Sequence, residues 1–134
     1  MMPAIAVFGI LAALWFPLFR YIAPRFYVVS GPSMLPALAD GDVVAGLKVH
    51  PSARMKTGGI YGYVMPGNRT GAGKRKWVIK RLAGCENGMC RFEGDNAGNS
   101  TDSRDYGPVS RESVLFEAFW HRSMKGEGGA AWQA

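Results

Sequence analysis

The sequence predicts a compact, mainly β domain that follows one N-terminal transmembrane helix. Residues 3–19 contain no charged side chain, and short apolar runs separated by turn residues make up the remainder. The 18 glycines and 8 prolines favour turns and short strands over a helical bundle. A hydrophobic share of 48% and a charged share of 19% exclude a disordered chain. A length of 134 residues allows one domain and little more.

The uncharged segment Pro3–Phe19 is the predicted membrane anchor. At about 17 residues it is at the short end of what spans a bilayer core. Arg20, Tyr21 and Arg25 follow, and arginines and tyrosines are typical of the membrane–water interface. We therefore divide the chain into a membrane anchor (1–23), a β domain (24–124) and a flexible tail (125–134).

Two other interpretations of the apolar segment stay open. A cleavable signal peptide would suit the small-x-small pattern Ala37–Ala39, but this lies well past the apolar run, and no Lys or Arg precedes that run. A buried core helix would be unusual, because the run is apolar on every face. The orientation is also open: the positive-inside rule puts Arg20 and Arg25 in the cytoplasm, whereas the function inferred below needs the domain on the opposite side.

Four apolar runs predict the strands of the β domain. They are Asp42–Val49, Ile60–Met65, Trp77–Ala83 and Val114–Trp120. The intervening stretches 51–59, 66–73 and 94–108 are rich in Gly, Asn, Ser or Pro and predict loops. The basic run Lys74–Lys76 borders one of these loops. No aromatic residues are interleaved with it, so we interpret it as a solvated loop and expect no nucleic-acid partner.

The stretch Cys85–Cys90 (CENGMC) predicts a hairpin, because Asn87-Gly88 suits a type I′ turn. Centring the turn there places Cys85 opposite Cys90, with Cα atoms about 4.5 Å apart, at the short end of the disulfide range. A cross-strand disulfide and two half-buried thiols both stay open. The same register, extended without a bulge, pairs Lys80 with Asp95.

Ser33 is the candidate nucleophile. It lies between two prolines in Ser30–Pro36 (SGPSMLP), on a stiff, non-helical turn. Such a loop can hold a hydroxyl at a fixed angle with backbone N–H groups turned toward an oxyanion, although a serine there is also ordinary turn chemistry. The hydroxyl needs a base. No neighbour would orient His50 or His121, so we interpret both as structural.

Lys80 is the candidate base. Its amine must be neutral, and lowering the pKa from about 10.4 to near 8 corresponds to roughly 3 kcal/mol, which desolvation can supply. Lys80 alternates with Val78 and Leu82, so apolar groups flank its stem. The alternative is a half-exposed surface lysine. Glu93 or Asp95 on the same face would favour the charged amine.

The polar segment Gly94–Val109 is the third element. Its short hydrogen-bonding side chains suit an ordered loop that bonds to itself through Asx and Ser/Thr turns. Asp102 can pair with Arg104, and Ser100 can offer its hydroxyl to the Lys80 amine. The glycine and glutamate positions of a calcium-binding EF-hand are not matched. We expect neither a metal nor a cofactor.

Together these elements resemble the type I signal peptidase family, membrane peptidases with a Ser/Lys dyad. Ser33–Pro36 is similar to the family's nucleophile box and Ile79–Arg81 to its lysine box. Gly94–Asn96 through Asp102–Arg104 is similar to its last box. Residues 30–34 and 99–104 look closest to the mitochondrial inner-membrane peptidase branch and to compact bacterial relatives.

The resemblance implies a signal-peptidase-like β domain in which Ser33 is the nucleophile and Lys80 the general base. It also implies that Ser100 orients the Lys80 amine, that Asp102 and Arg104 brace the site, and that the Ser33 backbone N–H helps to form the oxyanion hole. The further matched positions are Met34, Pro36, Arg81, Gly94, Asp95 and Asn96. This sequence departs from the family at Gly31, where many members carry a serine whose hydroxyl completes the oxyanion hole.

The function implied by the resemblance is a single-pass membrane serine endopeptidase that removes N-terminal leader sequences from precursor proteins. Its catalytic domain would lie on the extracytoplasmic or intermembrane-space side, with precursor proteins and membrane lipid as partners and an oligomeric state that stays open. One alternative is a catalytically inactive, membrane-tethered interaction subunit with the same fold. Another is a self-cleaving Ser/Lys regulator, which would carry a DNA-binding module in place of Pro3–Phe19.

Overall fold

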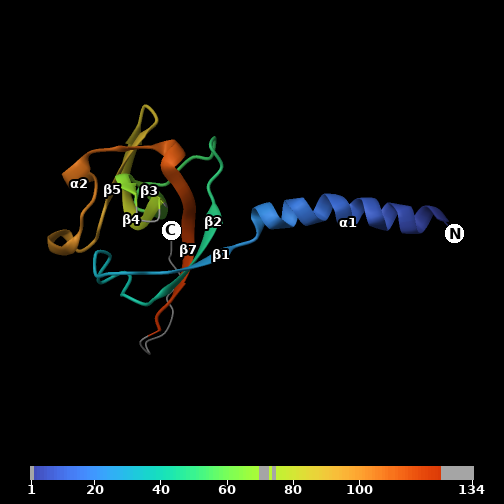
Figure 1. Ribbon diagram of the computed structural model, residues 1–134, viewed down its shortest axis with the longest axis horizontal. Coiled ribbons are helices and arrows are strands. Elements are labelled where there is room, and N and C mark those ends of the chain that lie inside the picture. The colour runs from blue at the N-terminus through green and yellow to red at the C-terminus, as the bar shows by residue number, and fades with distance from the viewer. Residues whose placement is uncertain (1, 70–72, 74, 125–134) are drawn as a thin grey trace.

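The computed structural model describes residues 2–69, 73 and 75–124 of the chain. Within these residues, seven antiparallel strands form one sheet, and a long helix, α1 (Met2–Ile22), precedes them. Figure 1 shows α1 projecting from the β body as a separate rod. The predicted mainly β fold after one apolar N-terminal helix is therefore confirmed. The predicted tail at 125–134 lies outside the described residues, as does Lys74.

Helix α1 is long and apolar enough to cross a membrane over Ala4–Ile22, where the mean hydropathy is 1.9. None of that span is buried inside the described protein, so the interpretation as a buried core helix is wrong. Its C-terminal end touches the sheet, where the Lys48 ammonium lies 5.1 Å from the centre of the Tyr21 ring. This cation–π contact joins the end of the helix to strand β2 (Val43–Lys48).

The strands follow the order β1-β2-β7-β3-β4-β5-β6 across the sheet. The remaining strands are β1 (Arg25–Val28), β3 (Ile60–Arg69), β4 (Arg75–Glu86), β5 (Met89–Glu93), β6 (Val109–Ser110) and β7 (Val114–Arg122). The described residues also form one short helix, α2 (Ser103–Tyr106), and two 3₁₀ turns, η1 (Ala97–Asn99) and η2 (Arg111–Ser113). The four predicted strands correspond to β2, β3, β4 and β7.

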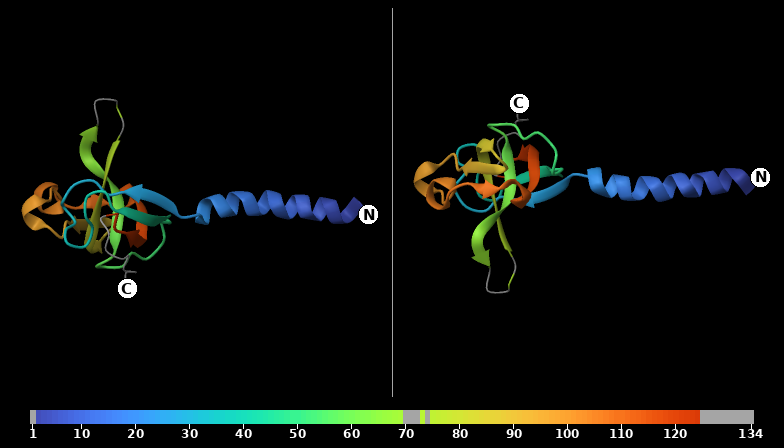
Figure 2. Two further views of the ribbon diagram at one scale, coloured as in Figure 1. Left: turned by 90° about the horizontal axis from the view of Figure 1, so that it is seen from below. Right: turned by 90° about the horizontal axis from the view of Figure 1, so that it is seen from above.

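The hairpin formed by β3 and β4 is longer than predicted. The first half of the predicted loop at 66–73 is strand, because β3 continues through Pro66 to Arg69, and β4 begins at Arg75. Lys76 is therefore a strand residue and not a loop residue. Pro66 cannot donate to a sheet ladder, and it falls where the β3–β4 register shifts. The two arms project from the β body, as Figure 2 shows.

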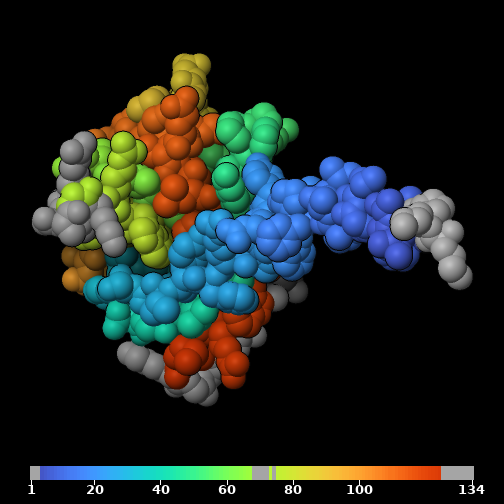
Figure 3. Space-filling model, turned by 45° about the vertical axis from the view of Figure 1, so that its right-hand side comes forward, coloured from blue at the N-terminus to red at the C-terminus, as the bar shows by residue number. Residues whose placement is uncertain are grey.

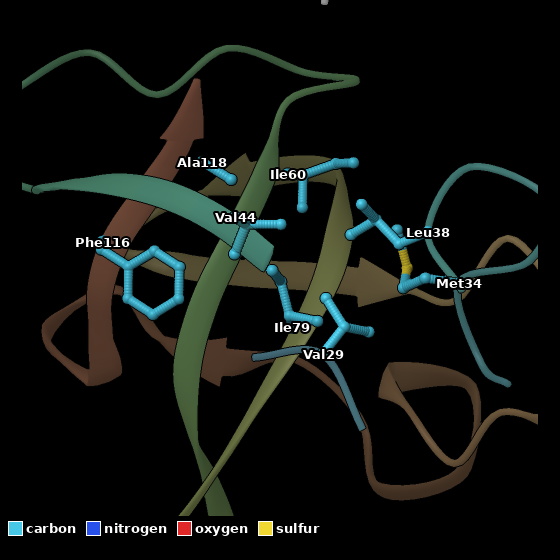
Figure 4. Close-up of a cluster of buried hydrophobic side chains, with 8 residues drawn as sticks. All are labelled: Val29, Met34, Leu38, Val44, Ile60, Ile79, Phe116 and Ala118. Atoms are coloured by element: carbon cyan, nitrogen blue, oxygen red, sulfur yellow. The ribbon is translucent and has the colours of Figure 1, made fainter. Parts of the chain in front are cut away.

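Buried side chains gather in two clusters on opposite faces of the sheet, because successive residues of a strand point to opposite faces. Along β3, Ile60 belongs to the first cluster, and Tyr61 and Tyr63 belong to the second. The first cluster, shown in Figure 4, contains Val29, Met34, Leu38, Val44, Ile60, Ile79, Phe116 and Ala118. Because Val29 and Met34 flank Ser33 in the sequence, this cluster anchors the predicted nucleophile segment on the sheet.

The ring of Phe116 is packed between the backbone and another ring. The ring covers the backbone of Gly46 in β2 and of Gly62 in β3. A Cβ atom on Gly62 would overlap the ring. Tyr27 of β1 stacks on the same ring with centroids 3.8 Å apart and an interplanar angle of 8°. Glycine at position 62 is therefore required by the close approach of Phe116.

Gly62→Ala is expected to lower the free energy of unfolding by about 1–3 kcal/mol, because the added methyl forces the Phe116 ring out of its place. Chemical denaturation of the full chain in detergent micelles would measure this change. Gly84→Ala is the matched control, because no atom lies within 4 Å of the position its Cβ would take. Equal losses in the two variants would contradict the proposed packing.

Candidate active site

The segment before β2 holds Ser33 through its backbone. The Gly31 N–H donates to the Asp40 carboxylate at 2.8 Å, and the Asn96 N–H donates to the Ser33 carbonyl at 3.0 Å. The Asn96 side-chain amide also donates to the Pro32 carbonyl at 3.1 Å. Met34 is fully buried in the first core cluster. The hydroxyl of Ser33 is thus carried by a segment fixed on both sides.

Lys80 extends from β4 to the Ser33 hydroxyl. Its amine donates a hydrogen bond to Ser33 Oγ, and the residue is only 4% exposed. The structure therefore brings together the two side chains that the sequence predicts as a dyad. It also places Lys80 on the face of β4 that carries Val78 and Leu82. Leu82 belongs to the second cluster, and Val78 packs against it. The alternative of a half-exposed surface lysine does not hold.

The electrostatic environment of Lys80 favours the neutral amine. Burial lowers the pKa of Lys80 below the range of an ordinary lysine. The Asp102 carboxylate acts in the opposite direction, and the positive charges of Lys76 and Arg104 lower the pKa further. The net shift is downward, toward what a general base requires.

The predicted pairing of Lys80 with Asp95 is wrong, because a bulge intervenes. The β4–β5 register shifts by one residue between Leu82 and Gly84, so Arg81 pairs with Glu93. The Asp95 carboxylate instead receives two hydrogen bonds from Arg81, at 2.8 and 2.6 Å. The carboxylate that raises the pKa of Lys80 is therefore that of Asp102, whereas Asp95 forms an ion pair with Arg81.

Asp102 is the centre of a network that orders the segment after β5. Its side chain is fully buried and accepts hydrogen bonds from the Gly94 N–H at 2.8 Å and the Ser100 hydroxyl at 2.6 Å. Arg104 donates to both carboxylate oxygens, at 2.9 and 2.5 Å, which confirms the predicted pair. Asp102 also caps α2 in a reciprocal capping box with Asp105.

Burial alone would raise the pKa of Asp102, but the hydrogen bonds from Arg104, Gly94 and Ser100 outweigh it. The pKa of this carboxyl therefore lies well below its usual range, and the group stays ionised. A buried carboxylate held in this way fixes the positions of the groups that bind it.

Ser100 lies beside the dyad but is bonded differently from the prediction. Its hydroxyl donates to Asp102, and within the described part of the chain Ser33 is the hydrogen-bond partner of the Lys80 amine. Ser100 and the Ser33 carbonyl both crowd Gly94, where a Cβ would lie 2.6 Å from that carbonyl oxygen. Because Gly94 has no side chain, the segment after β5 can pack closely against the segment that carries Ser33.

The disulfide between Cys85 and Cys90 is formed, so the interpretation as free thiols is wrong. The two residues are paired across the hairpin as predicted. Asn87 and Gly88 take the positive φ angles of 50° and 77° that the turn requires. This bond closes the end of the β4–β5 hairpin opposite to Lys80.

An open groove ends at the dyad. Its volume is about 330 Å³, and it lies between the stretch from Tyr27 to Ser33 and the stretch from Lys76 to Lys80. Trp77 meets Tyr27 edge-to-face, with ring centroids 5.3 Å apart. Figure 3 shows the blue β1 segment and the yellow-green start of β4 side by side on one face of the molecule.

Both walls of the groove carry unpaired strand edges. Among the described residues, β1 pairs with β2 alone. Strand β5 pairs with β4 only from Arg81 to Glu86. Among the described residues, the part of β4 before Arg81 therefore has no strand partner on the edge that faces β5. Such edges present free N–H and C=O groups to an extended peptide.

Sequence reasoning missed an aromatic pair next to this network. The hydroxyls of Tyr63 in β3 and Tyr106 in α2 are hydrogen-bonded to each other. Burial is the main reason that the pKa of Tyr63 is raised, so the pair stays protonated. Tyr63 lies in a predicted strand, but nothing in the sequence relates it to Tyr106. Of the two histidines, His50 bonds to Ser52, and His121 lies inside β7 and not after it.

A scan against protein-family models found no match to this chain, and a search of curated proteins found no significant relative. The chemistry of the site therefore carries the functional proposal.

Asp102→Asn is expected to lower the free energy of unfolding by about 2 kcal/mol near pH 7, because it removes the buried carboxylate that accepts hydrogen bonds from the Gly94 N–H and the Ser100 hydroxyl. The pKa of Asp102 is lower in the folded protein than the value of about 3.9 in an unfolded chain. Its contribution is thus fully present above about pH 4 and is lost as the pH falls through the folded value.

Denaturation curves between pH 2 and pH 7 would measure the loss of stability in Asp102→Asn and the pH range over which the wild type loses the contribution of Asp102. Glu86→Gln, at an exposed carboxylate of the hairpin, is the control and should lose little stability. A pH dependence identical in the wild type and in Asp102→Asn would disprove the assignment.

Proposed function

We propose that this protein is a serine endopeptidase in which Ser33 is the nucleophile and Lys80 the general base. The observation that carries the proposal is the contact between the buried Lys80 amine and the Ser33 hydroxyl at the end of an open groove. A serine needs a base within hydrogen-bond reach, and a desolvated lysine can serve as one. The resemblance of residues 33–36, 79–81 and 94–104 to the boxes of type I signal peptidases supports the same roles.

The reaction follows from these two groups. In its neutral form the Lys80 amine takes the hydroxyl proton while Ser33 Oγ bonds to the scissile carbonyl carbon. The resulting ammonium returns the proton to the leaving amine as the peptide bond breaks, which leaves an acyl-enzyme ester on Ser33. Lys80 then takes a proton from water, whose oxygen attacks the ester carbon. The bond from that carbon to Ser33 Oγ breaks, and the Lys80 ammonium returns the proton to Ser33 Oγ as the second product leaves.

The oxyanion would be stabilised by backbone donors. The Ser33 N–H has no hydrogen-bond partner among the described residues, so it is available to the oxyanion. The Gly31 N–H is already bound by Asp40, and Gly31 has no side chain to donate. We therefore assign the Ser33 N–H as the primary donor.

The substrate would bind as an extended strand in the groove, between the free edges of β1 and β4. Backbone hydrogen bonds from such edges give affinity without demanding a particular sequence. The groove has Val29, Val44 and Ile79 among its lining residues, which suits small apolar side chains near the scissile bond. This mode of binding fits the removal of an extended leader segment from a precursor protein.

We further propose that α1 anchors the enzyme in a membrane and that its substrates are membrane-associated precursors. The length and hydropathy of Ala4–Ile22 support this anchoring. The Cys85–Cys90 disulfide supports a catalytic domain on the extracytoplasmic or intermembrane-space side, because disulfides persist in oxidising compartments.

Ser33→Ala and Lys80→Met are each expected to lower the rate of precursor cleavage by about a thousandfold or more, because each removes one half of the dyad. Cleavage of a leader-containing precursor by the full chain in detergent micelles, followed by mass spectrometry, would measure the loss. Lys56→Met, at an exposed lysine outside the groove, is the matched control and should keep its activity. Undiminished cleavage by Ser33→Ala would eliminate Ser33 as the nucleophile.

The value of kcat/KM is expected to rise with pH along a limb that reports the neutral Lys80 amine. Because burial lowers the pKa of Lys80, this limb should lie below the value of about 10.4 for an ordinary lysine. Lys76→Gln removes a positive charge that also lowers this pKa, so it should move the limb to higher pH. Initial rates from pH 6 to pH 10.5 would measure both, and a limb unmoved by Lys76→Gln would refute this electrostatic effect.

A further inference from the structure

The groove carries one feature that the dyad does not use: the side chain of Lys76. Lys76 lines the groove, four residues before Lys80 on β4, and it is exposed. No other charged residue besides Lys80 lines the groove, as far as the described residues go. The walls are otherwise apolar or neutral, with Trp77, Val78 and Ile79 from β4 and Asn99 and Thr101 from the segment after β5.

Among the described residues, the Lys76 ammonium has no carboxylate partner. The ion pairs within the described part of the chain join Arg81 to Asp95 and Arg104 to Asp102, and Lys76 is in neither. A peptide that fills the groove covers part of this ammonium. Removing an unpaired charge from water is unfavourable, whereas a carboxylate from the peptide would offset the loss. A peptide with a negative group beside Lys76 should therefore bind the groove more tightly than a neutral peptide.

The spacing along β4 defines where that group must lie. Lys76 and Lys80 point to the same face of the strand, because they are four residues apart and the side-chain period is two. Their Cα atoms are separated by roughly 13 Å at about 3.3 Å per residue. A peptide extended beside β4 advances at the same rate. With its scissile bond at Ser33, it places a side chain about four residues away against Lys76.

The geometry points to a substrate preference: we propose that the groove selects peptides with Asp or Glu about four residues from the scissile bond, paired with Lys76. This inference rests on the proposed endopeptidase function and names a feature of its substrates. The stretches Tyr27–Ser33 and Lys76–Lys80 both end at the dyad, so the groove extends to one side of the scissile bond only. The acidic residue is accordingly preferred on one side of that bond.

The test uses peptides that share one cleavable core and differ in one residue. Asp, Asn or Lys is placed four positions before the scissile bond in one series and four positions after it in a second. The full chain in detergent micelles should cleave the Asp peptide about two- to fivefold more efficiently than the Asn peptide in one series. The Lys peptide of that series should be cleaved less efficiently than the Asn peptide by a similar factor. Raising the salt concentration should reduce both differences.

Lys76→Glu should reverse the order, so that the Lys peptide becomes the best substrate of that series. Any effect of this variant on the Lys80 amine is common to all the peptides and cancels in the ratio of their kcat/KM values. Lys56→Glu makes the same charge change outside the groove and should keep the wild-type order. Binding of the same peptides to Ser33→Ala, measured by fluorescence anisotropy, should show the same order without turnover.

Equal kcat/KM values for the three peptides in both series, from an enzyme that cleaves them, would overturn this inference and leave the endopeptidase function intact. The same conclusion would follow if Lys56→Glu changed the order as much as Lys76→Glu. Failure of the wild type to cleave any of the peptides or a leader-containing precursor would contradict the proposed function, and the substrate preference with it.

Discussion

The structure depends on keeping one amine buried beside one hydroxyl without a carboxylate of its own. A buried charge is costly unless it is paired, and pairing would hold the Lys80 amine in its charged form. The fold avoids both outcomes by engaging the nearby acidic groups elsewhere. Asp95 binds Arg81, and Asp102 binds Arg104, Ser100 and the Gly94 N–H. The amine is left with the Ser33 hydroxyl as its hydrogen-bond partner within the described residues.

This arrangement requires three segments that are far apart in the sequence to meet with little tolerance. The nucleophile segment is anchored by Met34 in the core and by Asn96, which holds the backbone of Ser33. The bulge between Leu82 and Gly84 changes the register of the β4–β5 hairpin, while the Cys85–Cys90 disulfide closes its other end. The capping box of α2 then orients Asp102. Each of these devices is local, and together they define the position of the dyad.

The parts of the fold that depend on short-range patterns could be predicted from the sequence. Short apolar runs between turn residues located four strands, and Asn87-Gly88 located the hairpin turn and thus the pairing of Cys85 with Cys90. The contact of Ser33 with Lys80 could be predicted only because their motifs resemble those of a known family. No period in the sequence relates two residues so far apart in the chain.

Features decided by long-range packing were missed. The register of β4 with β5 was extended without a bulge although Gly84, a glycine inside a strand, is typical of one, so the predicted Lys80–Asp95 pair failed. The β3–β4 arms extend past Pro66 because the register can shift there, whereas proline alone predicts a loop. The Tyr63–Tyr106 pair joins a strand to a helix that the sequence did not predict.

If the proposed endopeptidase function holds, the position of Ser33 and Lys80 relative to α1 constrains which substrates the protein would cleave. Figures 1 and 2 show α1 leaving one end of the β body, whereas the segment that precedes β2 and helix α2 lies toward the other end. The chain from Ile22 to Ser33 can span at most about 40 Å, and β1 lies within this stretch, beside the groove.

If α1 crosses a bilayer, a peptide in the groove follows the path from the membrane toward Ser33. An extended segment between the membrane and the scissile bond is then needed, because a helix rises only about 1.5 Å per residue and cannot pair with a strand edge. Under the proposed function, a precursor whose cleavage site is helical would have to unwind before Ser33 could reach its carbonyl carbon.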